Sequence, residues 1–349
     1  MASLAPTAEP VRSLVFDQRI KDLLARDEKV FRIDATTVGV SDADLIASVV
    51  AARPVLSTER SVFKPAGGAD ISHSSATRTI RALGKDVTAG MDTPAPAGQK
   101  LSGAWPHAGV AYLREWLFTS DSLPVSMLSH PGVMRSDILS RIADNITALW
   151  PANAPGETGS ALSAGILQAS STLDRRQGAA LYRRAISVLC DGVSALATNA
   201  LWLMAAHHRE DETDLKAVLW ETLRLLPPAW MLWRTGGGEY TPLDGRIGPG
   251  DNIALFPLLM HCDPQYWSSP LEFRPERWST VADPEAEAGY MPFGFDGAHC
   301  WARHLILPLA ERLLTEVLAN RLTVSPAQRE AHVPLRSLLS VRIDMVAAV

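Results

Sequence analysis

The chain has 349 residues, of which 47% are hydrophobic and 20% are charged, and its formal net charge is −5. These values are ordinary for a globular protein, and the scattered lysines and arginines give no sign of a nucleic-acid partner. The N-terminus lacks a basic start followed by an apolar stretch, and no segment is an uninterrupted apolar run of about eighteen residues. We therefore expect a cytoplasmic protein with no membrane anchor.

The first half of the chain predicts few long regular elements. Residues 29–52 predict two short strands and a helix capped by Ser41 or Asp42. Residues 64–104 are rich in glycine, proline, alanine and serine, which predicts a long loop. Modest helical periodicity follows over three segments, 108–120, 132–150 and 158–171.

The second half has clearer signals. Residues 174–207 predict the longest helix, and its apolar character on every face after Ile186 predicts a buried central helix. A second helix over 214–226 ends at Pro227, because proline disfavours a helical residue before it.

Strands and turns fill the rest of this half. Strands are predicted at 230–233 and 252–256, and a Pro-rich irregular stretch runs to Pro292. A tight turn after Pro292 leads into a helix over about 301–319, and closing strands are predicted over 334–346. The fold class is thus mainly α with a small β region.

Four motifs occur in a fixed order. They are Glu221-Thr-Leu-Arg224, the Phe-Arg-Pro-Glu-Arg-Trp stretch over 273–278, the Tyr-Met-Pro-Phe-Gly-Phe stretch over 290–295, and Cys300 at the start of a predicted helix. Glu221 and Arg224 share one helical face and can form an ion pair. That spacing alone is common on exposed helices, so the order and spacing of all four carry the signal. Together they resemble the cytochrome P450 family.

The resemblance implies one domain over 1–349 with the cytochrome P450-type fold. Its cofactor would be haem b (iron protoporphyrin IX), held between the long distal helix and the proximal cysteine loop, with Cys300 as the axial thiolate ligand. A thiolate is a strong donor to haem iron, and a position just before a helix stabilises the anion. The other reading is that Cys300 is a small buried apolar residue, as most free cysteines are.

Cys190, Cys262 and Cys300 are an odd number at wide spacing, which argues against disulfides and a zinc site. A thiol hydrolase using His299 and Cys300 is disfavoured, because neighbouring turn residues rarely point at each other and no orienting Asn or Asp is evident.

Further site residues follow from the resemblance. Arg277 would join Glu221 and Arg224 in a buried triad, and Phe293 and Gly294 belong to the cysteine loop.

Two residues are candidates to pair with haem propionates. Arg234 matches a family arginine with that role, and His299 lies next to the expected basic position. The run Ala229, Trp230 and Met231 would border the substrate pocket, although it also reads as a plain core strand.

The cysteine loop departs from the family pattern at three positions. Asp296 and Ala302 stand where the family has glycine, and Ala298 stands where it has a basic residue.

The distal helix lacks the acid and threonine pair of family monooxygenases, and two alignments remain open. Aligning Gly192 with the family glycine puts Ser194 at the acid position and Ala195 at the alcohol position. Counting back from the helix end puts Asp191 at the acid position and Gly192 at the alcohol position. A buried Asp191 would need a partner or would hold its proton. Val193 and Ala195 are further candidates for the substrate pocket.

The distal region over about 64–171 looks abbreviated for the family. No pattern near Trp105 and His107 assigns a second propionate-binding residue.

The predicted function is a haem-thiolate oxidoreductase, a monooxygenase of secondary metabolism. It would use dioxygen and electrons from an external ferredoxin- or flavodoxin-type partner, since no flavin or iron–sulfur segment is seen. The missing threonine favours atypical chemistry such as coupling, desaturation or peroxide use. The alternatives are a haem-thiolate isomerase or dehydratase that needs no electrons, and a non-catalytic haem-binding protein.

Overall fold

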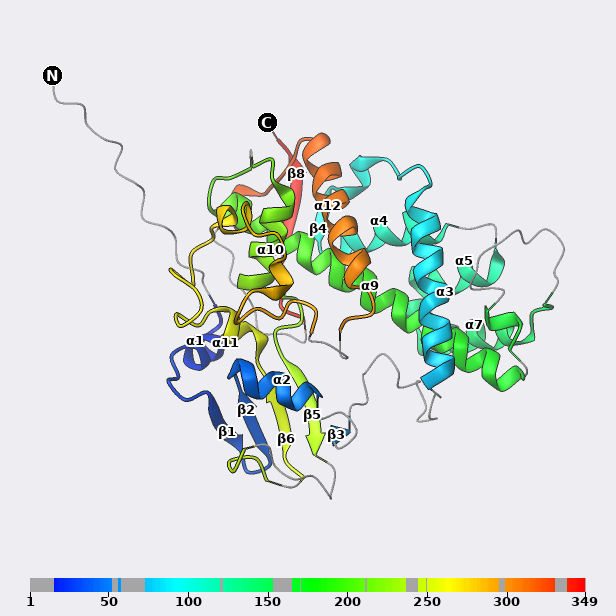
Figure 1. The fold of residues 1–349 in the computed structure, drawn as a ribbon. Coiled ribbons are helices and arrows are strands. Elements are labelled where there is room, and N and C mark those ends of the chain that lie inside the picture. Colours follow the sequence, from blue (N-terminus) through cyan, green and yellow to red (C-terminus); the bar gives the residue numbers. More distant parts are fainter. Residues whose placement is uncertain are drawn as a thin grey trace.

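The computed structural model describes residues 16–51, 56–57, 73–119, 122–152, 165–169, 171–210, 212–236, 244–248, 250–294, 299–329 and 338–348. Helices dominate these residues, and two small sheets complete the fold (Figure 1). The mainly α prediction is confirmed.

The longest element is α9 (Thr172–Ala206), which runs through the middle of the molecule (Figure 1). Ser171 caps it by accepting a hydrogen bond from the Asp174 amide, and nearly every residue from Leu189 onward is buried. The helix is long and apolar enough to cross a membrane, but 78% of its most apolar window is buried inside the protein. It is therefore the core helix that the sequence predicts.

Two further helices of the second half pack on α9. α10 (Leu215–Leu225) is capped by Asp214, and α12 (Arg303–Ala319) begins three residues after Cys300. Both were predicted from the sequence. The chain between them contains α11 (Pro257–His261) and the short 3-10 helices Pro275–Trp278 and Pro284–Ala286.

A five-stranded sheet lies at one end of the molecule, in the order β1-β2-β6-β5-β3. The strands are β1 (Val30–Asp34), β2 (Thr37–Val40), β3 (Leu56–Ser57), β5 (Leu232–Gly236) and β6 (Asn252–Leu255). β2 and β6 are parallel and the other pairs are antiparallel. Helix α1 (Gln18–Leu24) precedes the sheet, and α2 (Ala43–Ala51) follows β2. Of the two predicted caps for that helix, Asp42 accepts from the Leu45 amide at 2.8 Å.

A smaller sheet joins distant parts of the chain in the order β4-β8-β7. β4 (Gly103–Trp105) and β7 (Leu322–Val324) each pair antiparallel with β8 (Ile343–Ala347). The predicted closing strands correspond to β8, and residues 334–337 of that prediction lie outside the described residues. Short 3-10 helices at Gly98–Leu101 and Pro326–Gln328 flank this sheet in the chain.

The loop predicted over 64–104 is wrong over 73–91, which forms α3 (His73–Met91). The buried positions Leu83, Val87 and Gly90 recur at helical spacing, but the segment around them is rich in alanine, serine, threonine and glycine, which read as loop. Gly90 allows α3 to pack closely against a neighbouring helix. A Cβ there would lie 2.6 Å from the carbonyl oxygen of Leu117 in α4 (His107–Phe118), so α3 and α4 approach closely.

The helix predicted over 132–150 is two helices, α6 (Pro131–Arg135) and α7 (Asp137–Leu149). They separate at Ser136, whose hydroxyl accepts from the Leu139 amide and starts α7. α5 (Leu123–Ser129) precedes them and was not predicted. Residues 158–164 of the next predicted helix lie outside the described residues.

Candidate active site

Glu221 and Arg224 form the most buried ion pair of the described structure. Both side chains have no exposed surface, and two bonds of 3.0 and 2.8 Å join the Arg224 Nε and Nη2 to the two carboxylate oxygens. Burial lowers the pKa of Arg224, but the bonds to Glu221 outweigh it and hold the pKa above its ordinary value. Arg224 is therefore charged and fixed in place.

Glu221 also binds the segment that follows α11. Its carboxylate accepts from Arg277 Nε at 3.2 Å, from Trp278 Nε1 at 2.9 Å and from the Arg274 amide at 3.0 Å. The structure thus brings together the three residues predicted as a triad. Sequence reasoning missed Trp278 as a fourth participant, although its indole follows Arg277 directly.

Arg224 uses its remaining donors on backbone carbonyls. Nη1 donates to the carbonyls of His261 and Pro270 at 2.9 and 2.6 Å, and Nη2 donates to Glu272 at 3.1 Å. One arginine of α10 therefore sets the path of a segment that has little regular structure of its own.

Aromatic rings connect this network to the cysteine loop. The buried His261 accepts a hydrogen bond from the Met291 amide at 2.8 Å, and its ring lies 4.9 Å from that of Tyr290. The Trp220 ring lies 6.0 Å from that of Phe293. Burial, followed by the nearby Arg224 charge, lowers the pKa of His261 to about 3, so the ring stays neutral.

Cys300 lies shortly before α12. Gly294 has a φ of +88°, a conformation that suits glycine, and the Cys300 amide donates to the Phe293 carbonyl at 2.6 Å. Arg303 begins the helix three residues later. The predicted placement of the cysteine just before a helix is confirmed. Asp296 and Ala298 lie outside the described residues.

The three cysteines differ in access. Burial raises the pKa of Cys190 and that of Cys262 to about 12, and both thiols are packed in the core. Cys300 is half-buried. It is the only one of the three that is not buried, which fits a ligand to a bound group.

The side of α9 around Gly192 faces open space. A Cβ added at Gly192 would have no atom within 4 Å outside the backbone of its own helix. Val188, one turn earlier on this face, is 48% exposed. An open face on an otherwise buried helix is what the haem implied by the resemblance requires, and the residues present fit that group.

Asp191 lies on this open face, so the expectation that it is buried is wrong. Its side chain is 41% exposed, and it accepts from the Ser187 hydroxyl at 2.9 Å. The buried Arg114 of α4 approaches it at 3.7 Å, and the Arg114 Nε has no hydrogen-bond partner among the described residues. Sequence reasoning missed Arg114. The sequence feature that could have indicated Arg114 is its position as a single arginine within an apolar helical stretch.

Ser194 lies on a different side of α9. Its side chain is fully buried, and its hydroxyl donates to the Pro106 carbonyl at 2.7 Å, which holds α9 against the start of α4. Val193 and Ala195 are also buried in the core, so the structure does not bring these three residues to the open face.

The other predicted residues lie near β5 and the cysteine loop. Arg234 of β5 donates through Nη1 to the Trp233 carbonyl at 2.8 Å, and His299 is half-buried. Trp230 packs in the core, with its ring 5.9 Å from that of Phe256. Ala229 is exposed and Met231 is half-buried. Trp230 thus has the core role that was the alternative reading.

Comparisons with known proteins agree with this arrangement. The family model described as Cytochrome P450 matches residues 208–300, which hold Glu221, Arg224, Arg277 and Cys300. Human cytochrome P450 3A5 is 35% identical over 123 residues, 35% of this chain and 24% of the human protein. Cyclooctatin synthase of Streptomyces melanosporofaciens is 39% identical over 82 residues, 23% of this chain and 18% of that protein. The matches span about a quarter or less of these relatives.

The fold comparison covers far more of the chain. A mutant of P450 EryK in complex with erythromycin B superposes with a TM-score of 0.65 at 15% identity, over 95% of this chain and 96% of that one. A structure from a study of unusual cytochrome P450-like monooxygenases involved in microbial secondary metabolism gives 0.62 at 13% identity, over 93% and 96%. This chain has the cytochrome P450 fold, and its residues 208–300 match the cytochrome P450 family model.

Proposed function

We propose that the protein is a haem-thiolate oxidoreductase in which Cys300 is the axial ligand of haem b. The observation that carries the proposal is the position of Cys300. It is the one cysteine that is not buried, and it lies between Gly294, which has a positive φ, and the start of α12. When bound, the haem would supply the oxidation of an organic substrate with dioxygen and external electrons.

Other residues of the chain would hold the cofactor. Arg234 and His299 are the proposed partners of the propionates, because carboxylates near a low-dielectric pocket need a charged or hydrogen-bonding partner. Arg114 is a further candidate, since it is buried beside the open face of α9 and retains an unpaired Nε among the described residues. The triad of Glu221, Arg224 and Arg277 keeps the cysteine loop in place without touching the haem.

Asp191 is proposed to relay protons on the distal side. Its carboxylate is exposed on the open face, and the Ser187 hydroxyl and Arg114 orient it. Gly192 occupies the alcohol position in this alignment, so that position supplies no hydroxyl side chain. Water or a hydroxyl of the substrate would then complete the path, which favours atypical outcomes such as coupling, desaturation or peroxide use.

The substrate is proposed to be a small molecule of secondary metabolism. Relatives named cyclooctatin synthase and cyclooctat-9-en-7-ol 5-monooxygenase, both from Streptomyces melanosporofaciens, support this class. Ala229 and Met231 have exposed surface beside Arg234 and remain candidates for the pocket. A soluble cytoplasmic protein with a ferredoxin- or flavodoxin-type donor would fit this role.

The test is the absorption spectrum of the dithionite-reduced protein under carbon monoxide. Thiolate ligation gives a strongly red-shifted Soret band, which Cys300→Ser should abolish. Cys190→Ser and Cys262→Ser are matched controls that should keep it. An unchanged spectrum in Cys300→Ser would refute the assignment.

A second candidate is a haem-thiolate isomerase or dehydratase that needs no electrons. The glycine at the alcohol position, Gly192, favours it, because such reactions require no proton delivery to activated oxygen. Turnover that is unaffected by reductant and dioxygen would select this function. A non-catalytic haem-binding protein would show no substrate-induced spectral change.

A further inference from the structure

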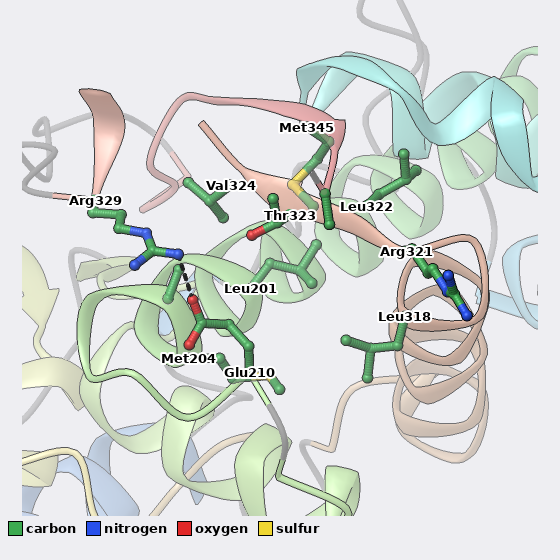
Figure 2. Close-up of a pocket in the computed structure, with 12 residues that line it drawn as sticks. Leu201, Met204, Glu210, Leu318, Arg321, Leu322, Thr323, Val324, Arg329 and Met345 are labelled. Atoms are coloured by element: carbon green, nitrogen blue, oxygen red, sulfur yellow. Dashed lines mark hydrogen bonds and ion pairs between the residues drawn. The ribbon is translucent and has the colours of Figure 1, made fainter. Parts of the chain in front are cut away.

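A cavity of about 450 Å³ lies far from the proposed haem site. It is formed by the C-terminal ends of α9 and α12 and by strands β7 and β8, and Figure 2 shows its side chains. Leu318 lies fifteen residues beyond Arg303 in α12, which corresponds to about 22 Å along the helix axis. The cavity is therefore separate from the pocket beside Cys300.

The inner surface of the cavity is mainly apolar. Its apolar side chains are those of Leu201, Met204, Leu318, Leu322, Val324 and Met345. Its volume falls within the range of small-molecule pockets, roughly 300–1,000 Å³. The body of a bound molecule would therefore be apolar.

Charged groups stand at opposite sides of the cavity, as Figure 2 shows for Arg321 and Arg329. Arg329 donates to Glu210 through Nη2 at 2.8 Å, while its buried Nε has no hydrogen-bond partner among the described residues. The Arg321 side chain forms no ion pair within the described part of the chain. Arg321 and Arg329 carry two positive charges and Glu210 carries one negative charge, so the cavity has a net charge of +1. This net charge complements one anionic group.

We propose that this cavity binds an amphipathic monocarboxylate, with its carboxylate at Arg329 and its apolar body against the α9 and α12 residues. Charge-assisted bonds from a guanidinium favour a carboxylate over a neutral head group. The site is independent of the haem chemistry, so it stands or falls separately from the proposed function.

The test is calorimetric titration of the full-length, haem-loaded protein with decanoate and with decan-1-ol. The haem pocket is first blocked with 1-phenylimidazole, so that binding there is excluded. Decanoate should bind at one site, and more tightly than the alcohol. No decanoate binding to the blocked protein would overturn the proposal.

Variants place the binding in the cavity. Arg329→Gln should weaken decanoate roughly tenfold or more and leave decan-1-ol nearly unchanged. Arg321→Gln, at an exposed position that is safe for folding, should weaken decanoate about two- to fivefold. Thr323→Trp should fill the cavity and reduce the binding of both ligands.

Arg312→Gln is the matched control, because Arg312 is a partly exposed arginine of α12 that pairs with Glu316 and does not line the cavity. It should bind decanoate like the parent protein. Equal affinity in the two cavity arginine variants and the parent would assign decanoate to another place and contradict the proposal.

Discussion

The region from α10 to α12 and the region from α5 to α7 differ in what their buried side chains do. In the first, fully buried charges bind backbone groups directly, as Glu221 and Arg224 do. In the second, α7 turns small and polar residues such as Ala143 and Asp144 inward, and its large aliphatic residues outward. Ile138 and Leu149 are 72% and 74% exposed.

The family model and the structural superposition cover different parts of the chain, in line with this contrast. The family model matches only residues 208–300, where side-chain identity determines the path of the backbone. The structural match covers 95% of the chain at 15% identity, so the rest keeps the shape with different residues. A region held by specific polar bonds retains its sequence, whereas a region held by packing needs only suitable volumes.

The largest expected effect is a loss of turnover on substitution of Asp191. Its side chain is partly exposed at the proposed site, unlike the fully buried Glu221 and Arg224. Asp191→Asn should lower turnover per haem roughly 10²- to 10⁴-fold, as loss of a general acid does, while haem content stays near normal. The measurement is product formed per haem, together with the haem incorporated.

Ser194→Ala is the control for Asp191, because the Ser194 hydroxyl is bonded to the Pro106 carbonyl. It should keep its turnover per haem and lose about 1 kcal/mol of unfolding free energy. A loss of turnover confined to Ser194→Ala would favour the other alignment of α9. Full turnover in both variants would point to proton delivery by the substrate.

Glu221→Gln should cause the largest loss of stability. It leaves the fully buried Arg224 without a charge partner, which costs on the order of 3–5 kcal/mol. Urea unfolding measures this change. Glu316→Gln, which removes the carboxylate of an i,i+4 pair in α12, should cost at most about 0.5 kcal/mol. Similar losses in the two variants would show that the fully buried pair stabilises the protein no more than a partly exposed one.

His261 makes the α10 to α12 region sensitive to pH. Its folded pKa of about 3 lies below the unfolded value of 6.5, so the unfolded chain binds a proton first as the pH falls. Stability is therefore lost from about pH 6.5 downward, by roughly 2 kcal/mol at pH 5. His261→Gln keeps a hydrogen-bond acceptor and removes this titration. Urea unfolding at pH 7 and pH 5 should show a smaller pH effect in the variant, and an equal effect would exclude His261 as its cause.

The smallest effect is expected on the outer face of α7. Ile142 is 47% exposed, so Ile142→Ala should change the unfolding free energy by no more than about 0.5 kcal/mol. The matched substitution Ile186→Ala, at a fully buried position of α9, should cost about 2–5 kcal/mol. A large loss from Ile142→Ala would show that this face is covered in solution.

The sequence alone determined the elements with strong local signals. The apolar run of α9, the proline after α10 and the order of motifs from Glu221 to Cys300 each specify their structure over a few residues or by fixed spacing. For that reason the helices, the triad and the place of the cysteine could be predicted without coordinates.

Tertiary structure decided the rest. α3 forms because its small residues fit between neighbouring helices, with Gly90 against Leu117, and a segment rich in small and polar residues has too little hydrophobicity to be read as a core helix. The sequence left open whether Asp191 or Ser194 reaches the open face of α9. A helix that is apolar on every side does not reveal which side is covered, and only the packing of α4 against Ser194 leaves Asp191 exposed.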